Sequence, residues 1–235
     1  MSDSIRVVIG YDKREASAVW TLANSLLKRS RRPISFTFLY LPSLQRDNLM
    51  WRERDPKQST DFSYSRFLTP YLTNYKGQAI WMDCDMVAVG EWDVEELLGY
   101  AQMGVDVAVI KHNYRPLGTV KFGGAIQEGY PKKLWSSLMV FNCYTARCQH
   151  LTPKYVNEAS GANLHQFEWT IEPRIAEIPE AYNWIPGHSN ERVPADEARL
   201  IHYTEGGPSW KAYENAANAE VWWQEYREAS AVGVE

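Results

Sequence analysis

The sequence has no long apolar run, no long basic block and few cysteines, and each absence narrows the possible functions. No stretch approaches the ~20 apolar residues that span a bilayer. The formal net charge is −4, which does not favour binding to a nucleic-acid phosphate backbone. The N-terminus, MSDSIRVVIG, lacks the basic start and long apolar run of a signal peptide. We therefore expect a cytoplasmic protein with no membrane span and no nucleic-acid partner.

Cysteine usage argues against a disulfide framework and against a cysteine-based zinc site. The chain has three cysteines, Cys84, Cys143 and Cys148, an odd number without framework spacing. We expect reduced thiols. A zinc site would need a CxxC pair or a cluster of histidine and cysteine, and the sequence shows neither pattern.

What the sequence does contain is an alternation of strand and helix patterns. IRVVIGY (5–11) predicts a buried strand, and apolar residues at positions 19, 22, 23, 26 and 27 form a helical stripe. ISFTFLYL (34–41) predicts the next strand, so the two strands should be parallel. Further strands are expected at 78–83, 105–110, 136–143 and 198–203, and further helices at 61–72, about 145–158, 165–172 and 217–229.

Segment 111–135 contains glycine, proline and several cations, which is typical of a functional loop. The pattern predicts one α/β domain with a sheet that is parallel first and mixed later.

The stretch QAIWMDCDMV (78–87) ends an apolar strand in two acids, Asp83 and Asp85. Residues two apart in a strand point to the same face, about 7 Å apart. Two carboxylates about 4 Å apart repel by roughly 1–4 kcal/mol, so either one is protonated or a cation lies between them. Hard oxygen donors at the carboxyl end of a strand suit Mg²⁺ or Mn²⁺ that holds a diphosphate. The alternative is a structural pair of acids that caps a turn.

Four segments carry a family resemblance: VVIGYD in the first strand and turn, YSRF in a helix upstream of the acids, IWMDCDMVAVG, and the late IHYTEGG. Together they resemble the retaining GT-A-fold glycosyltransferases related to glycogenin and the bacterial lipooligosaccharide galactosyltransferases, a family 8-like group. The likeness covers most of the chain. It is closer still to small bacterial and phage glycosyltransferases with segments such as STDFSYSRFL, WSSLMVFNC and LHQFEW.

The resemblance implies a fold and a domain arrangement. We expect a GT-A-like single domain over 1–235, with a Rossmann-like, mostly parallel central sheet flanked by helices. Residues 1–100 would form the nucleotide-binding half. Residues 101–235 would form the acceptor half and carry the C-terminal metal-binding histidine.

The resemblance also implies the ligands of the site. Asp83, Asp85 and His202 would bind Mn²⁺ or Mg²⁺, with Asp83 also near the ribose. The metal would hold the diphosphate of a nucleotide-sugar donor, most often a UDP-sugar. Arg66 would reach the diphosphate or the donor sugar as a fixed cationic fork. Tyr11 and Asp12 would line the pocket for the base and ribose.

The chain departs from the family pattern in several places. Relatives often place a lysine on the phosphate soon after the histidine; here Lys211 comes three positions late, and the N–H groups of Gly206 and Gly207 offer another phosphate cradle. The donor-sugar contact falls on WSSLMVFNC, at Ser137. The polar pair near the reacting centre falls on LHQFEW, at His165 and Gln166. Arg66 and Gln166 are the predicted catalytic residues.

Three functions remain open on the sequence alone. The main hypothesis is a metal-dependent hexosyltransferase with the DxD motif. The family resemblance implies that it retains the configuration of the transferred sugar. The acceptor alternatives are a glycan, a lipid-linked sugar and a protein. A sugar nucleotidyltransferase is the second, although IGYDKREA has a lone glycine where such enzymes carry a glycine-rich loop. The third is a non-catalytic carbohydrate-binding module, because the chain holds ten Trp and fourteen Tyr that could stack on sugars.

Overall fold

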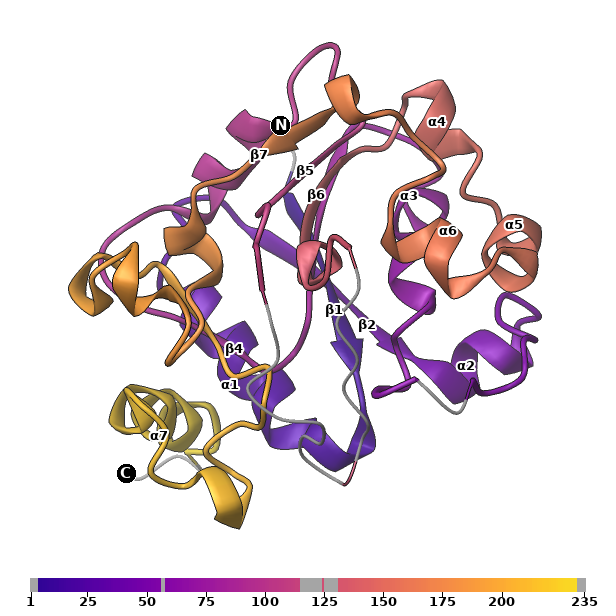
Figure 1. Cartoon of the computed structure of the whole chain (residues 1–235). Coiled ribbons are helices and arrows are strands. Elements are labelled where there is room, and N and C mark those ends of the chain that lie inside the picture. The colour runs from indigo at the N-terminus through magenta and orange to yellow at the C-terminus, as the bar shows by residue number, and fades with distance from the viewer. Residues whose placement is uncertain (1–3, 56–57, 115–123, 125–130, 232–235) are drawn as a thin grey trace.

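A six-stranded sheet forms the centre of the molecule (Figure 1). The computed structural model describes residues 4–55, 58–114, 124 and 131–231. The strand order is β2-β1-β3-β6-β5-β7, and a second sheet pairs β4 with β8. The strands are β1 (Ile5–Tyr11), β2 (Ile34–Tyr40), β3 (Gln78–Met82), β4 (Met86–Ala88), β5 (Val107–Val109), β6 (Leu138–Asn142), β7 (Ile175–Glu177) and β8 (Leu200–His202).

The strand directions confirm the predicted α/β class. Strand β1 runs parallel to β2 and β3, and β5 runs parallel to β7. Strand β6 is antiparallel to its two neighbours, β3 and β5. The carboxyl ends of β1, β3 and β5 therefore meet at one edge of the sheet, where open α/β sheets bind their ligands. Apolar side chains of these strands form the core, and most are fully buried.

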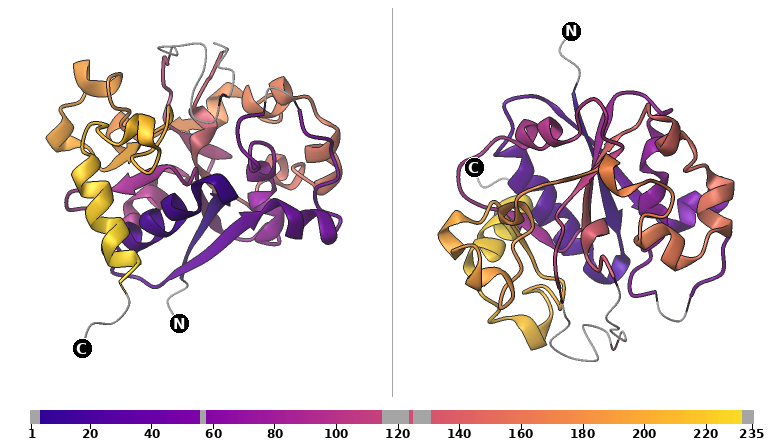
Figure 2. Two further views of the ribbon diagram at one scale, coloured as in Figure 1. Left: turned by 90° about the horizontal axis from the view of Figure 1, so that it is seen from below. Right: turned by 45° about the horizontal axis from the view of Figure 1, so that its top comes forward.

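Helices cover both faces of the sheet (Figure 2). On one face lies α1 (Ala16–Leu27), which packs against α7 (Ala219–Ala229). The other face carries α3 (Thr69–Leu72), α4 (Ala146–Gln149), α5 (Pro153–Glu158) and α6 (Gly161–His165). Helix α2 (Leu41–Arg46) follows β2 directly in the sequence. Nine short 3-10 helices complete the elements, at Lys13–Glu15, Ser65–Leu68, Val94–Tyr100, Trp135–Ser137, Glu172–Arg174, Glu180–Asn183, Ser189–Glu191, Ala195–Glu197 and Lys211–Tyr213, all within the described residues.

The predicted apolar stripe of α1 is confirmed for Val19, Leu22 and Leu26, which are fully buried, whereas Leu27 is 55% exposed. The docking of α7 on α1 has an ionic component. Glu225 of α7 is buried and forms ion pairs with Lys28 and Arg29 at the end of α1. A buried carboxylate without such partners would be unfavourable, so these pairs hold the C-terminal helix in place.

Several predicted helices differ in extent. The region 61–72 is a 3-10 helix followed by α3, and Pro70 lies in the first turn of α3, where its missing N–H is tolerated. The helix expected at 145–158 is divided into α4 and α5, and Pro153 begins the second. The helix predicted at 165–172 is wrong: α6 ends at His165, because Phe167 adopts a left-handed φ of 58° that a helix cannot continue through.

The loop predicted at 111–135 falls mainly outside the described residues, which resume at position 131. Among the residues that are described, no helix combines the length and the apolar character needed to cross a membrane.

Gly10 is predicted to be essential for the packing of β1 against the loop at 59–63. A Cβ at this position would lie 2.3 Å from the ring of Phe62, which is buried. We expect Gly10→Ala to destabilise the protein by about 1–3 kcal/mol, because the ring has to move in a packed core. Urea unfolding measures this change. The control is Gly99→Ala, where a Cβ meets nothing within 4 Å and stability should change by less than about 0.5 kcal/mol. Equal stability of the two variants would contradict the packing argument.

Candidate active site

A cavity of about 420 Å³ lies at the carboxyl edge of the sheet. Its walls come from Asp55 and the three segments 58–66, 133–137 and 161–166, together with Asp83, Asp85 and Thr204. This volume is in the range of small-molecule binding sites, and the lining mixes aromatic, apolar and polar side chains. The predicted acids thus border this cavity.

The two sheets together position the acids and the histidine. Asp83 follows β3, and its N–H donates to the Ser137 carbonyl across the β3–β6 pair. Asp85 directly precedes β4, which pairs with β8 so that Met86 lies opposite His202. The N–H of Tyr203 donates to the Asp85 carbonyl at 2.9 Å and continues this ladder. Two segments that are more than a hundred positions apart therefore bring Asp85 and His202 side by side.

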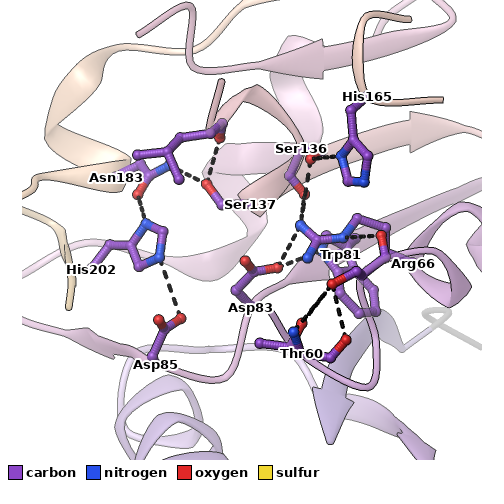
Figure 3. A network of polar contacts seen from close by, with 12 residues as sticks. Thr60, Arg66, Trp81, Asp83, Asp85, Ser136, Ser137, His165, Asn183 and His202 are labelled. Atoms are coloured by element: carbon purple, nitrogen blue, oxygen red, sulfur yellow. Dashed lines mark hydrogen bonds and ion pairs between the residues drawn. The ribbon is translucent and has the colours of Figure 1, made fainter. Parts of the chain in front are cut away.

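Asn183 determines which ring nitrogen of His202 faces the acids (Figure 3). The Ser137 hydroxyl donates to the Leu134 carbonyl, so it accepts a hydrogen bond from the Asn183 amide nitrogen, 2.7 Å away. The amide oxygen of Asn183 therefore lies toward His202 Nδ1, at 2.8 Å, and accepts its proton. In the neutral imidazole, Nε2 then carries a lone pair.

This lone pair faces Asp85. His202 Nε2 lies 3.3 Å from Asp85 Oδ1, and ligand atoms of Asp83, Asp85 and His202 all lie within 4.8 Å of one another. Two electron-rich atoms this close need a proton or a metal ion between them. Neighbouring ligands of an octahedral ion at about 2.1 Å are about 3 Å apart, which the observed pair matches closely. Two carboxylates and an imidazole nitrogen thus fit the divalent metal that the fold family implies.

Arg66 offsets the charge of Asp83. Its NH1 atom lies 2.8 Å from Asp83 Oδ1 and donates to the Ser136 carbonyl at 2.7 Å. The guanidinium lies near the rings of Phe62 and Trp81, 5.5 and 5.4 Å from their centroids. These contacts hold the cation in a fixed position beside the acids.

Burial raises the pKa of Asp83, and the charge of Asp85 adds to this, whereas Arg66 and His202 act in the opposite direction. A hydrogen bond from Trp81 Nε1, 3.1 Å from Asp83 Oδ1, also favours the ionised form. The net shift is upward, so further positive charge at this position would stabilise the ionised carboxylate.

The structure brings most of the predicted site residues together. Arg66, Asp83, Asp85, Ser137 and Gln166 line the main cavity. His202 and Gly206 line a smaller adjacent cavity of about 160 Å³, which shares Thr204 with the first.

Other predicted residues lie elsewhere. Asp12 lines neither cavity; it accepts hydrogen bonds from Arg14 and from the N–H of Asp61, and so anchors a segment of the cavity wall to the end of β1. Tyr11 packs edge-on against Tyr40. Their predicted contacts with base and ribose remain predictions.

The glycine loop after β8 forms a turn. The N–H of Gly206 donates to the Tyr203 carbonyl at 2.9 Å, and the predicted contact of this loop with a phosphate remains a prediction. Gly206 has a φ of 154°, and a Cβ there would lie 2.4 Å from the Tyr213 ring, so glycine is required for this turn. Gly207 is buried and lines neither cavity, and Lys211 is exposed on the following 3-10 helix.

Two further residues shape the site. Ser136 Oγ lies 2.9 Å from His165 Nδ1, and both side chains line the cavity. Burial lowers the pKa of His165 to about 3, so its imidazole is neutral near pH 7.

Asn183 is a residue of the site that the sequence analysis did not predict. Its signal in the sequence is an amide between two large aromatics, in AYNW, where a polar side chain in an apolar run needs a buried partner.

Comparisons with solved structures identify the class of fold. The chain aligns with the bifunctional glycosyltransferase WbbM with a TM-score of 0.67 and 13% identity, covering 96% of this chain and 50% of that one. It aligns with the galactosyltransferase LgtC, solved with donor and acceptor sugar analogues, with a TM-score of 0.61 and 12% identity, covering 97% and 98%. The predicted GT-A-like fold is confirmed, because the chain has the fold of these glycosyltransferases.

Sequence comparison places the chain in a particular family. It is 37% identical over 225 residues to Protein CDI of Arabidopsis thaliana, covering 95% of this chain and 86% of that protein. The chain therefore belongs to the Protein CDI family. It is also 26% identical over 181 residues to the probable glycosyl transferase Gly of Streptococcus gordonii, of which the alignment covers 24%, against 70% of this chain. The chain therefore spans about half the length of WbbM and 24% of the length of the Streptococcus gordonii protein. No family model matches the sequence.

Asn183→Ala tests the orientation of His202. Without the amide, the imidazole can rotate and can place its proton on Nε2, so we expect Mn²⁺ to bind about 10–100-fold more weakly. Titration calorimetry with Mn²⁺ measures this. Asn215→Ala, at an exposed position, is the control and should bind as the unmodified protein does. Unchanged affinity in a folded Asn183→Ala protein would show that Asn183 does not orient a metal ligand.

Proposed function

We propose that the chain is a metal-dependent retaining glycosyltransferase that transfers a sugar from a nucleotide-sugar donor, with UDP-sugar as the favoured donor, to an acceptor hydroxyl. One observation carries the proposal: Asp83, Asp85 and His202 converge beside a cavity at the carboxyl edge of the sheet. The glycosyltransferase names of structurally similar proteins support the reaction class.

The residues of the site would have separate roles in binding the metal and the leaving group. Asp83, Asp85 and His202 would hold Mn²⁺ or Mg²⁺, which when bound supplies positive charge to the leaving diphosphate. Arg66 keeps Asp83 in place, and Asn183 keeps Nε2 of His202 directed at the acids. Because these groups are held before substrate arrives, little reorganisation is required as negative charge develops on the diphosphate.

The bond changes can be stated for a front-face displacement. The bond from the anomeric carbon to the diphosphate oxygen breaks, and the acceptor oxygen bonds to the same face of the sugar. The departing phosphate takes the proton of the acceptor hydroxyl. His165 is poorly suited to act as the base, because its pKa is lowered to about 3 and its Nδ1 contacts the Ser136 hydroxyl. Ser137 and Gln166, on the cavity wall, are the proposed contacts of the donor sugar and the reacting centre.

Asp85→Asn tests this proposal with little change of shape. The substitution removes a charge from the three-residue cluster, and we expect turnover to fall by about 10²-fold or more. The measurement is UDP release from UDP-sugars in the presence of Mn²⁺. Asp47→Asn, at an exposed ion pair with Arg46, is the matched control and should retain full turnover.

Three outcomes would contradict the proposal. Normal turnover of a folded Asp85→Asn protein would exclude the metal role of Asp85. Sugar binding that persists in EDTA without any nucleotide dependence would instead favour a non-catalytic carbohydrate-binding module. Release of pyrophosphate from a nucleoside triphosphate and a sugar phosphate would favour the nucleotidyltransferase.

A further inference from the structure

A second cluster of possible metal ligands lies outside the main cavity. His112, Glu180 and His188 each offer one ligand atom, and these atoms lie within 4.8 Å of one another. His112 follows β5, at the edge of the sheet that also carries Asp83. Glu180 begins the 3-10 helix that ends in Asn183. None of the three lines either of the two cavities described above.

His112 is the unusual member of this cluster. Its side chain is fully buried, and neither ring nitrogen makes a hydrogen bond to any residue that the structure describes. A buried polar group without a hydrogen-bond partner costs about 1–3 kcal/mol. Burial lowers the pKa of His112 to about 3, so the ring is neutral and has a lone pair to donate. His188 Nε2 is also buried and makes no hydrogen bond within the described part of the chain.

Glu180 faces these rings as an oriented carboxylate. Its Oε1 lies 3.7 Å from His112 Nδ1 and accepts hydrogen bonds from Ser189 and from Arg192 NH2, both at 2.6 Å. Its Oε2 accepts from Arg192 Nε at 2.7 Å. A carboxylate has about four acceptor sites; Oε1 accepts two of these three bonds, so the remaining site is on Oε2. Ligating carboxylates are commonly held by such outer hydrogen bonds.

We propose that His112, Glu180 and His188 bind a transition-metal ion of the zinc type, as a second metal site separate from Asp83, Asp85 and His202. Two imidazoles and one carboxylate form a ligand set that suits Zn²⁺, whereas two carboxylates with one imidazole suit a harder ion such as Mn²⁺ or Mg²⁺. The proposal does not depend on the transferase reaction.

The position of this site gives it a structural consequence. Glu180 and Asn183 are the two ends of one 3-10 helix, and Asn183 holds Nδ1 of His202. An ion at the second site would tie this helix to His112 and to the loop at 185–189. It would therefore support the orientation of His202 without contacting substrate.

Cobalt absorption tests the proposal directly, because Co²⁺ substitutes for Zn²⁺ and absorbs visible light strongly when tetrahedral. The full chain is stripped with a chelator and titrated with Co²⁺. We expect a visible band in the unmodified protein and in Asp85→Asn, and its loss in both His188→Gln and His112→Gln. Excess Zn²⁺ should remove the band by competition. The control, His150→Gln, changes an exposed histidine and should keep the band.

Zn²⁺ and thermal unfolding provide a second readout. In the Asp85→Asn background, Zn²⁺ should raise the unfolding temperature, and adding His188→Gln should abolish this rise. Three results would overturn the proposal: no visible band in the unmodified protein, a band of equal strength in His188→Gln, or a band that disappears in Asp85→Asn.

Discussion

The site is organised around one constraint: the carboxylates of Asp83 and Asp85 lie close together and largely shielded from solvent, directly after the end of β3. Asp83 and Asp85 are 13% and 8% exposed in their side chains, in a region where unpaired charge is unfavourable. Residues from different parts of the chain offset the negative charge of these two acids. Arg66 forms an ion pair with Asp83, Trp81 donates a hydrogen bond to it, and His202 faces Asp85. A site built in this way is suited to a divalent cation, because further positive charge lowers the energy of both acids.

The fold explains why these groups meet. Parallel strands β1 and β3 end at the same edge, and the β4–β8 ladder places His202 opposite the residue that follows Asp85. The helix Glu180–Asn183 then connects two clusters of possible metal ligands, because one of its ends faces His112 and the other holds His202. The orientation of His202 thus depends on a helix whose first residue, Glu180, contacts groups outside the cavity.

Local patterns in the sequence predicted a large part of this arrangement. The apolar run of β1 and the Asp-Cys-Asp sequence identify the first strand and the acid pair, because both are properties of neighbouring residues. The helix at 165–172 could not be excluded in this way, since the left-handed backbone of Phe167 depends on its tertiary packing. Asn183 and the cluster of His112, Glu180 and His188 were also missed, because residues so far apart in sequence form no recognisable spacing and meet only in the fold.

The most direct test of the central claim is the stabilisation of the protein by UDP with and without a divalent ion. Thermal unfolding of the unmodified chain is compared with UDP and Mn²⁺ together, with each alone, and with UDP in EDTA. At 100 times its dissociation constant, a ligand should stabilise the folded state by about 2.7 kcal/mol. We expect UDP to stabilise the protein only when Mn²⁺ is present. Equal stabilisation by UDP in EDTA, or none under any condition, would contradict the claim that the buried acids hold a metal-bound nucleoside diphosphate.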